Sequence, residues 1–336
     1  MSRRSAYTLA YALAPAILQG CHRDCCGPDH NALSLYVGVH VDSAVFRTRG
    51  EFALELVPAD QTGETFVTDA WTISATLVSP SAGRLPLITQ RIEPADTQLT
   101  AAAIDIDDSP SVAFSDSQRV RASAAQLFWR TLLGAEPRNQ CALLDFGGPP
   151  SPGFELTRLL QTYTSAGSQL DAQLPSIQPL DGSTPLYHSA LEVLRWTDTT
   201  LTQTGYGRYL VIITDGQPSD TLYRDSLFAA ANGGAVRFFA VGVGPASDQG
   251  TKPHAAAVAA VRELATRTGG IYVGVTNAAQ LLPALQTLAR EPTGEKLLAD
   301  FAAPAPFPAR GQVVSGRVTV TGQHGTATAN WAFVAP

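Results

Sequence analysis

The sequence predicts an α/β fold in which a mainly parallel, Rossmann-like sheet is combined with an antiparallel β region. Between residues 101 and 290, short apolar runs alternate with stretches of helical spacing, a pattern typical of a doubly wound sheet covered on both faces. Before and after this region, apolar and polar residues alternate with a period of two, as in half-buried strands. A chain of 336 residues is long enough for two domains of ordinary size.

Composition and charge limit the classes of function. Apolar residues make up 45% of the chain and charged residues 15%, which is typical of a globular protein. The net charge is −6, and no cluster of basic and aromatic residues is suited to hold a phosphate backbone. We therefore expect no nucleic acid partner. Four cysteines are too few for a disulfide-built scaffold, so stability must come from the core.

The first 20 residues are typical of an export signal. Two arginines precede a mostly apolar stretch, residues 6–18, that is too short to span a bilayer comfortably. The letters Leu-Gln-Gly-Cys, which end at Cys21, then resemble the cleavage site of a bacterial lipoprotein. That resemblance implies that Cys21 is the lipid-modified first residue of an exported envelope protein, which the lipid attaches to a membrane. An ordinary secretory signal and a frayed N-terminal helix are the alternatives.

Residues 21–33 are expected to form a linker, in which Cys25 and Cys26 lie near two histidines. No second pair of ligands follows at a spacing typical of zinc sites, which argues against a metal cluster here. Cys141 lies in an apolar run and is expected to be buried. In an exported chain it would either stay free or pair with Cys25 or Cys26.

Residues 34–100 are expected to form antiparallel strands of a β-sandwich. Alternating apolar residues occur over 35–41, 52–56 and 71–77, and turn-forming segments with proline separate these runs. No long helical pattern interrupts them.

Residues 101–291 are expected to form the α/β domain. The predicted strands are 103–107, 142–146, 209–214, 236–243 and 271–275. The predicted helices are 116–133, 185–196, 254–268 and 278–290.

Residues 292–336 are expected to begin as a proline-rich linker, up to residue 308, and to end as a β-hairpin with strands 314–321 and 327–334. Two strands alone are only marginally stable, because they cannot bury their own apolar face. The simplest partner is the region 34–100, which would give one sandwich that is split in sequence by the inserted α/β domain. The alternative is a separate hairpin that packs on the α/β domain.

Three loops at predicted strand ends or helix starts carry polar residues. Ligands of open α/β sheets bind beyond the carboxyl ends of the strands, where such loops lie. The first loop has the pattern D-x-S-x-S, the second carries a threonine just before a helix, and the third has the pattern T-D-G. The polar residues concerned are Asp107, Ser109, Ser111, Thr184 and Asp215.

This set of side chains favours a hard divalent cation. Carboxylates and hydroxyls suit Mg²⁺, Mn²⁺ or Ca²⁺ better than zinc, because the set offers no thiolate or imidazole. Two carboxylates nearly neutralise a dication, and hydroxyls and water can fill most of the remaining positions. One position can then stay open for an oxygen from outside. Pro110 helps to fix the coil that brings the first loop's side chains together.

These motifs resemble the metal-ion-dependent adhesion site (MIDAS) of von Willebrand factor A (vWA) domains, and residues 101–290 resemble such a domain as a whole. The resemblance implies that the serine and threonine hydroxyls ligate the metal and that the two aspartates do so directly or through water. It also implies a protein partner whose Asp or Glu side chain completes the coordination, and no catalysis. The sandwich would serve as a stalk or platform. Pro110 and Val112 stand where many members have Gly and Met, which could stiffen the loop or alter ligand access.

Other classes of function remain as alternatives. A structural envelope scaffold would have a closed or degenerate metal site. The order Asp105, Asp107, Ser109 superficially matches the nucleophile loop of phosphatases of the haloacid dehalogenase type, but the downstream groups that such chemistry requires are missing. Asp105 is therefore expected to be structural. A serine hydrolase is disfavoured because no G-x-S-x-G elbow is present. His188 is expected either to contact the residues that surround the metal ligands or to be a packed or solvated histidine.

Overall fold

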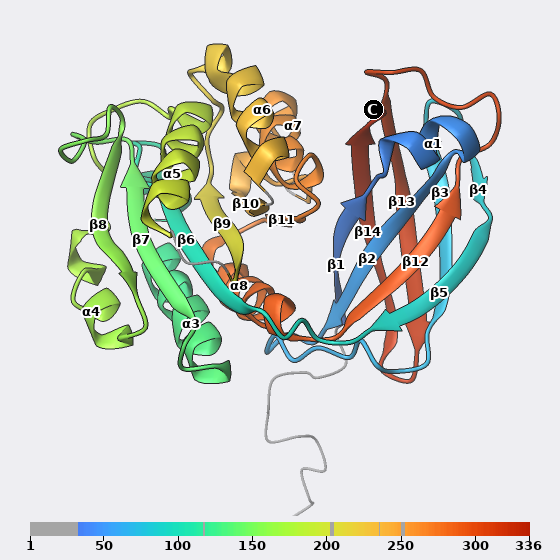
Figure 1. Cartoon of the computed structure of the whole chain (residues 1–336), viewed down its shortest axis with the longest axis horizontal. Helices are drawn as coiled ribbons and strands as arrows, with labels where there is room; N and C mark the ends of the chain where they lie inside the picture. The colour runs from blue at the N-terminus through green and yellow to red at the C-terminus, as the bar shows by residue number, and fades with distance from the viewer. Residues whose placement is uncertain (1–32, 117, 202–204, 235, 250–252) are drawn as a thin grey trace, which may run out of the picture.

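The computed structural model describes residues 33–336 except 117, 202–204, 235 and 250–252 (Figure 1). The strands are β1 (Ser34–His40), β2 (Glu51–Ala59), β3 (Thr72–Ser79), β4 (Gly83–Leu85), β5 (Leu87–Glu93), β6 (Leu99–Asp107), β7 (Gln140–Phe146), β8 (Thr157–Thr164), β9 (Tyr206–Thr214), β10 (Val236–Val243), β11 (Ile271–Val275), β12 (Lys296–Ala302), β13 (Val313–Gly322) and β14 (Gly325–Val334). The helices are α1 (Ser43–Arg49), α2 (Val112–Ser115), α3 (Val120–Ala135), α4 (Gly167–Asp171), α5 (Leu186–Thr200), α6 (Arg224–Gly234), α7 (Ala255–Thr266) and α8 (Leu281–Arg290).

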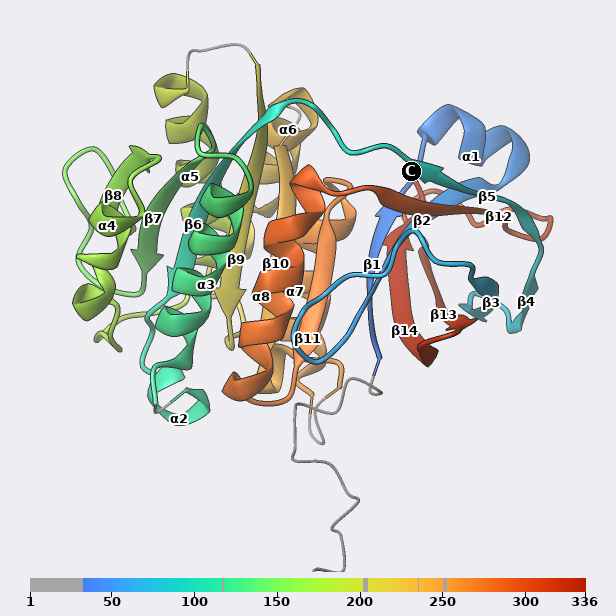
Figure 2. The same cartoon turned by 90° about the horizontal axis from the view of Figure 1, so that it is seen from below.

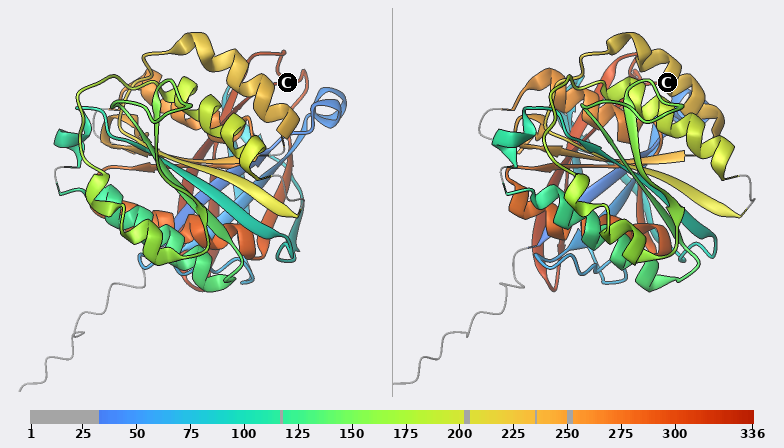
Figure 3. Two further views of the ribbon diagram at one scale, coloured as in Figure 1. Left: turned by 60° about the vertical axis from the view of Figure 1, so that its left-hand side comes forward. Right: turned by 90° about the vertical axis from the view of Figure 1, so that its left-hand side faces the viewer.

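A ten-stranded sheet in the order β5-β12-β2-β1-β11-β10-β9-β6-β7-β8 runs through the molecule. Strands β11, β10, β9, β6 and β7 are parallel to one another. Helices α3 and α8 cover one face of this parallel part, and α5, α6 and α7 cover the other (Figures 2 and 3). The strands are apolar throughout because both of their faces are buried. The predicted doubly wound α/β fold is confirmed.

The antiparallel strands at one side continue this same sheet. β1 joins it by pairing with β11 at Val37↔Tyr272 and Gly38↔Ile271, and β2, β12 and β5 follow in turn. One layer of the sandwich is therefore an extension of the α/β sheet. The sequence did not indicate this continuity, because alternation within a strand says nothing about which strand lies beside it.

The second layer of the sandwich is a four-stranded sheet in the order β14-β13-β3-β4. The C-terminal hairpin pairs with β3 of the N-terminal region, so the flanking segments form one unit and the hairpin is not separate. Aromatic side chains join the two layers, since Phe52 of β2 lies 5.1 Å, between ring centroids, from both Trp331 and Phe333 of β14. The core of the sandwich lies between these sheets.

Some elements differ from the sequence prediction. The segment 292–308, expected as a proline-rich linker, contains strand β12, whose Leu297, Ala299 and Phe301 are buried. The strand was missed because the prolines that follow it dominate the segment's composition. Helix α1 interrupts the N-terminal strands; the Asp42 carboxylate accepts hydrogen bonds from two backbone N–H groups at its start. Strand β8, an antiparallel edge strand, was also not predicted.

The predicted export signal, the lipidation site Cys21 and the pair Cys25 and Cys26 lie outside the described residues. Cys141 is a free and fully buried cysteine of β7, and burial raises the pKa of its thiol. Within the described part of the chain, no helix combines the length and the apolar character that crossing a bilayer requires.

Candidate metal site at the carboxyl edge of the sheet

The three polar loops meet beyond the carboxyl ends of β6 and β9. Asp107 is the last residue of β6, and Ser109 and Ser111 lead from it into the single turn of α2. Asp215 directly follows β9, and Thr184 lies just before α5. Because β6 and β9 are hydrogen-bonded neighbours, their loops emerge side by side. The structure thus brings together all five residues that the sequence singled out.

Hydrogen bonds link the oxygens of the five residues. The Ser111 hydroxyl donates to Asp215 Oδ1 at 2.6 Å, and the Ser109 and Ser111 hydroxyl oxygens lie 3.1 Å apart. The Thr184 hydroxyl donates to Ser109 Oγ at 3.3 Å. The Ser109 backbone N–H donates to Asp107 Oδ1 at 2.9 Å, which turns the loop back on its own aspartate. The D-x-S-x-S loop therefore coils around one point, as its spacing predicts.

The site is buried on its inner side and open on its outer side. Asp107, Ser109 and Asp215 are buried, whereas Ser111 is exposed and Thr184 is half-buried. Two large apolar side chains on the same edge are almost fully exposed. Phe114 of α2 is 92% exposed, and so is Leu222, in the segment that leads from Asp215 to α6. A group from another molecule can therefore reach the oxygens, with apolar side chains beside the opening.

Two further hydroxyls hold the carboxylates, and the sequence analysis did not assign them. The Thr214 hydroxyl donates to Asp107 Oδ2 at 2.5 Å, and the Ser115 hydroxyl donates to Asp215 Oδ2. Thr214 belongs to the T-D-G motif and was therefore within reach of the motif analysis. Ser115 carries no such signal, because its partner lies 100 residues away along the chain.

The two carboxylates lack a positive partner. Among the described residues, their hydrogen-bond donors are hydroxyl and backbone N–H groups, and no Arg, Lys or His side chain forms an ion pair with either. Burial and the nearby Asp215 carboxylate raise the pKa of Asp107 to about 6, against hydrogen bonds from Ser109 and Thr214 that lower it. The site thus concentrates negative charge in a partly buried place, which suits a cation.

The neighbouring aspartate is paired in a different way. The Asp108 carboxylate accepts hydrogen bonds from Arg121 Nε at 3.1 Å and Nη2 at 2.8 Å, and all of these atoms are buried. Arg121 Nη1 also donates to Asp116 Oδ2 at 2.9 Å. Asp116 in turn accepts from the backbone N–H groups of Val120 and Arg121 at the start of α3. This Asp108–Arg121–Asp116 cluster anchors the loop to the helix.

Close backbone approaches leave no room for side chains at two glycines. A Cβ on Gly216 would lie 2.9 Å from Thr184 Oγ1 and 3.4 Å from Asp107 Oδ2, so it would enter the space between these ligands. Gly147 has φ +108, and a Cβ there would lie 2.6 Å from the Ser109 backbone nitrogen. Gly216, first interpreted as a turn former, thus also keeps the site open.

Two other residues considered from the sequence do not join the site. Asp105 is buried and accepts a hydrogen bond from the Ser189 hydroxyl at 2.7 Å, and burial raises the pKa of its carboxyl to about 8. His188 stacks on Tyr223 with ring centroids 3.8 Å apart and approaches Glu155 at 3.4 Å. No contact joins His188 to the five residues within the described part of the chain. It is a packed histidine.

The donor set fits a hard divalent cation. The site offers carboxylate and hydroxyl oxygens, which Mg²⁺ and Mn²⁺ accept as ligands. In the described ranges, no group of three or more His, Cys, Asp or Glu side chains is placed to hold a metal ion. A site of two carboxylates and three hydroxyls is compatible with that absence, because its hydroxyl ligands belong to none of those residue types.

The sequence model of the von Willebrand factor type A domain matches residues 103–288. Among curated proteins, none matches the chain. Many solved structures also match, among them the following three. A von Willebrand factor type A protein from Catenulispora acidiphila has 11% identity and a TM-score of 0.44, over 90% of this chain and 73% of that one. The conserved hypothetical protein BatB from Bacteroides thetaiotaomicron has 22% identity and a TM-score of 0.41, over 56% and 96% of the two chains.

The third structure is the pilus adhesin SpaC from Lactobacillus rhamnosus GG in its open conformation. It has 10% identity and a TM-score of 0.43, over 89% of this chain and 46% of that one. Likenesses of this size concern the fold alone and say nothing about a ligand or partner of this chain.

Proposed function

Because the chain belongs to the von Willebrand factor A family, whose model covers residues 103–288, we propose that it is a binding protein and not an enzyme. Its ligand would be a protein that offers an Asp or Glu side chain to a divalent cation at the carboxyl edge of the sheet. Mg²⁺ is the proposed cation, with Mn²⁺ or Ca²⁺ as substitutes.

The residues of the site would have different roles. Ser109, Ser111 and Thr184 would hold the cation through their hydroxyls, and Asp107 and Asp215 would hold it directly or through water. The bound cation supplies a positive centre that accepts a carboxylate oxygen from the partner. Thr214 and Ser115 would orient the two aspartates, since their hydroxyls donate to Oδ2 of Asp107 and Oδ2 of Asp215.

One observation carries this proposal: two carboxylates and three hydroxyls converge at a partly open point without any positive side chain among the described residues. Buried carboxylates are normally paired with a cation or hydrogen-bonded in a way that compensates their charge. The exposed side chains Phe114 and Leu222 support a protein partner, because large apolar groups beside a polar centre are typical of interaction sites.

The direct test is calorimetric titration of Mg²⁺ and Mn²⁺ into the chain without residues 1–26. Asp107→Ala and Thr184→Ala should abolish or strongly weaken binding while circular dichroism shows an intact fold. The matched control is Asp225→Ala, because this carboxylate is 90% exposed and lies outside the site. A well-folded wild-type protein that binds neither metal would contradict the proposal.

A second titration separates the proposal from a structural scaffold with a closed site. Binding of an Asp-containing peptide to the metal-loaded protein is expected to require metal and to be lost on chelation. A peptide in which Asn replaces Asp is the control. If the protein binds metal but neither peptide, the metal has a structural role and the proposed coordination of a partner's carboxylate is wrong.

We also propose that the protein is exported and held at the cell envelope by a lipid on Cys21. Support comes from the order of arginines, apolar stretch and Leu-Gln-Gly-Cys in the sequence. Expression with a labelled fatty acid should give a labelled protein in the membrane fraction, and Cys21→Ser should abolish both the label and the membrane association. A wild-type protein that is secreted without label would point to an ordinary secretory signal.

A further inference from the structure

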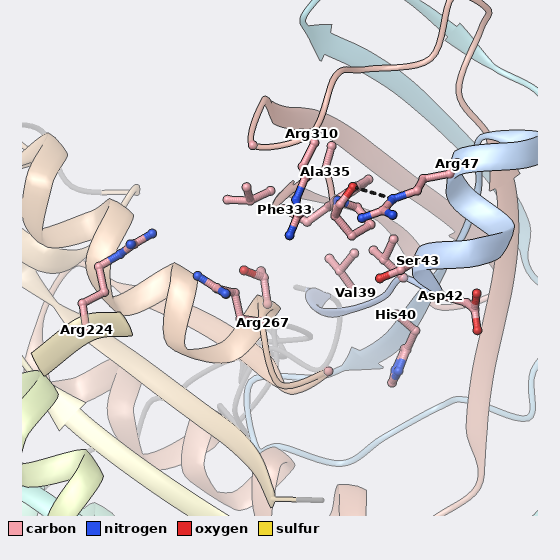
Figure 4. A pocket seen from close by; sticks show the side chains of 16 residues that line it. Val39, His40, Asp42, Ser43, Arg47, Arg224, Arg267, Arg310, Phe333 and Ala335 are labelled. Atoms are coloured by element: carbon pink, nitrogen blue, oxygen red, sulfur yellow. Dashed lines mark hydrogen bonds between the residues drawn. The ribbon is translucent and has the colours of Figure 1, made fainter. Parts of the chain in front are cut away.

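A cavity of about 820 Å³ lies between the α/β part and the sandwich (Figure 4). Residues of α6 and the end of α7 line one side, and residues of α1, β1, β14 and the loop before β13 line the other. Gly269, which lines it, precedes β11, whereas the candidate metal site lies beyond the carboxyl ends of the parallel strands. Most of the cavity therefore lies near the amino end of β11, although Arg224 comes from the start of α6, and the cavity shares none of the five residues of the candidate metal site.

Positive charge dominates this cavity. Arg47, Arg224, Arg267 and Arg310 come from four separate segments to line it. His40 also lines it, and its ring lies 2.8 Å from the buried Glu55 carboxylate. Among the described residues that line it, Asp42 is the only one with an acidic side chain. Asp42 already accepts hydrogen bonds from the backbone N–H groups of Ala44 and Val45. The chain as a whole carries a net charge of −6, so the arginines are a local reversal of its charge.

Part of this positive charge has no acidic partner among the described residues. In the described part of the chain, Arg310 is exposed and forms no ion pair, and Arg47 donates through Nε to the main-chain oxygen of Pro336 at 3.1 Å. Arg224 and Arg267 share the carboxylate of Glu263. Arg224 Nη1 also donates to the exposed Asp225 Oδ1 at 2.9 Å. Arg310 and Arg47 therefore retain donors for an anionic ligand, whereas Arg224 and Arg267 would share theirs with Glu263.

The form of the cavity favours an extended ligand with several anionic groups. Figure 4 shows Arg224, Arg267 and Arg310 spread along the cavity, and Arg47 turned toward the chain end, so they do not converge on one point as they would for a single phosphate. Val39 and Phe333 also line it, but their side chains are buried in the core of the sandwich, so polar and charged groups form most of the accessible lining. Strand β14, which contributes Phe333 and Val334, is an edge strand of its sheet, and edge strands can pair with an extended peptide.

We propose that this cavity binds an acidic peptide segment of a partner protein. Carboxylates of the segment would pair with Arg310 and Arg267, with Arg224 and Arg47 at the two ends. The charge and the volume suit a short peptide, because ligand cavities of about 300–1,000 Å³ bury most of a ligand of that size.

The test is fluorescence anisotropy with the full chain and a labelled eight-residue peptide of Asp, Glu and Leu. EDTA is present throughout, so that the peptide's carboxylates have no metal to bind at the candidate metal site. Arg310→Ala and Arg267→Ala should each weaken binding about tenfold, since each removes a charge-assisted hydrogen bond. The matched control, Arg84→Ala, removes an exposed arginine of β4 that lies outside the cavity. Binding should also weaken as salt rises.

The arms of the experiment separate the outcomes. A peptide with Asn and Gln in place of Asp and Glu should not bind, and Asp107→Ala should bind the acidic peptide like the wild type. Equal loss with Arg84→Ala would indicate unspecific attraction and overturn the proposal. Inorganic phosphate that displaces the peptide at micromolar concentration would identify a small-anion site instead. Failure of this proposal leaves the metal site untouched, because no metal takes part.

Discussion

Two adjacent aspartates of one loop meet opposite surroundings. Asp107 faces hydroxyls and a second carboxylate, and no positive side chain of the described residues pairs with it. Asp108 points to the other side of the loop and is fully paired with the buried guanidinium of Arg121. Both carboxylates are completely buried, so burial does not distinguish them.

The difference shows which of the two acidic clusters belongs to the fold. In the Asp108–Arg121–Asp116 cluster, Arg121 supplies the positive charge that the two carboxylates require, so the cluster does not require a bound cation. Its ion pairs fix the loop to α3. The cluster of Asp107 and Asp215 lacks a counter-charge and opens to the surface through Ser111. Under the proposed function, a bound cation would balance this charge. The structural cluster thus holds in place the loop that carries the binding cluster.

The largest effect is expected where the structural cluster is broken. Arg121→Met should lower the free energy of unfolding by about 3–5 kcal/mol, because it removes the guanidinium that contacts both buried carboxylates and leaves Asp108 with only the more distant Arg158, at 3.8 Å. Urea denaturation in EDTA measures this loss. Arg84→Met, at an exposed arginine of β4, should change stability by no more than about 0.5 kcal/mol. Equal stability of the two variants would mean that Arg121 does not hold the loop.

The next effect concerns stabilisation by metal. At a Mg²⁺ concentration 100 times its Kd, the wild type should gain about 2.7 kcal/mol, because the folded state alone binds the ion. Asp107→Asn should lose this gain, yet in EDTA it should be at least as stable as the wild type, since one of two facing carboxylates is removed. Thermal unfolding with and without Mg²⁺ measures both quantities.

Asp108→Asn is the matched comparison for Asp107→Asn. It should be less stable than the wild type in EDTA, because Arg121 loses a charged partner, but it should still gain stability from Mg²⁺. If the two Asn variants behave alike, the division between a structural and a binding carboxylate is wrong.

Much of this arrangement could be predicted from the sequence. Strands β10 and β11 were predicted with the bounds they have, because buried parallel strands are continuous apolar runs. The five polar residues were found because a strand, a loop motif and a helix follow one another locally. Arg121 and Ser115 were missed because their importance depends on partners brought near by folding. The extension of the sheet through β1 was missed for the same reason.

A smaller effect should come from Ser115, which touches a proposed ligand without being one. Its hydroxyl donates to Oδ2 of Asp215. Ser115→Ala therefore leaves the five proposed ligands present but frees the Asp215 carboxylate to rotate. Loss of such a supporting hydrogen bond typically weakens metal binding about 10–100-fold. Calorimetry should show a lower Mg²⁺ affinity with an unchanged stoichiometry of binding. An unchanged affinity would show that Ser111 alone fixes the orientation of Asp215.

The smallest effect is expected at His188, which marks the limit of the binding cluster. Its ring stacks on Tyr223 and lies against Glu155, so its contacts belong to the packing of α5. His188→Gln should therefore leave the Mg²⁺ affinity within about twofold of the wild type, as for other substitutions that do not touch a site. Any loss should appear as a lower unfolding temperature in EDTA. A tenfold loss of affinity with an unchanged unfolding temperature would extend the binding cluster to α5.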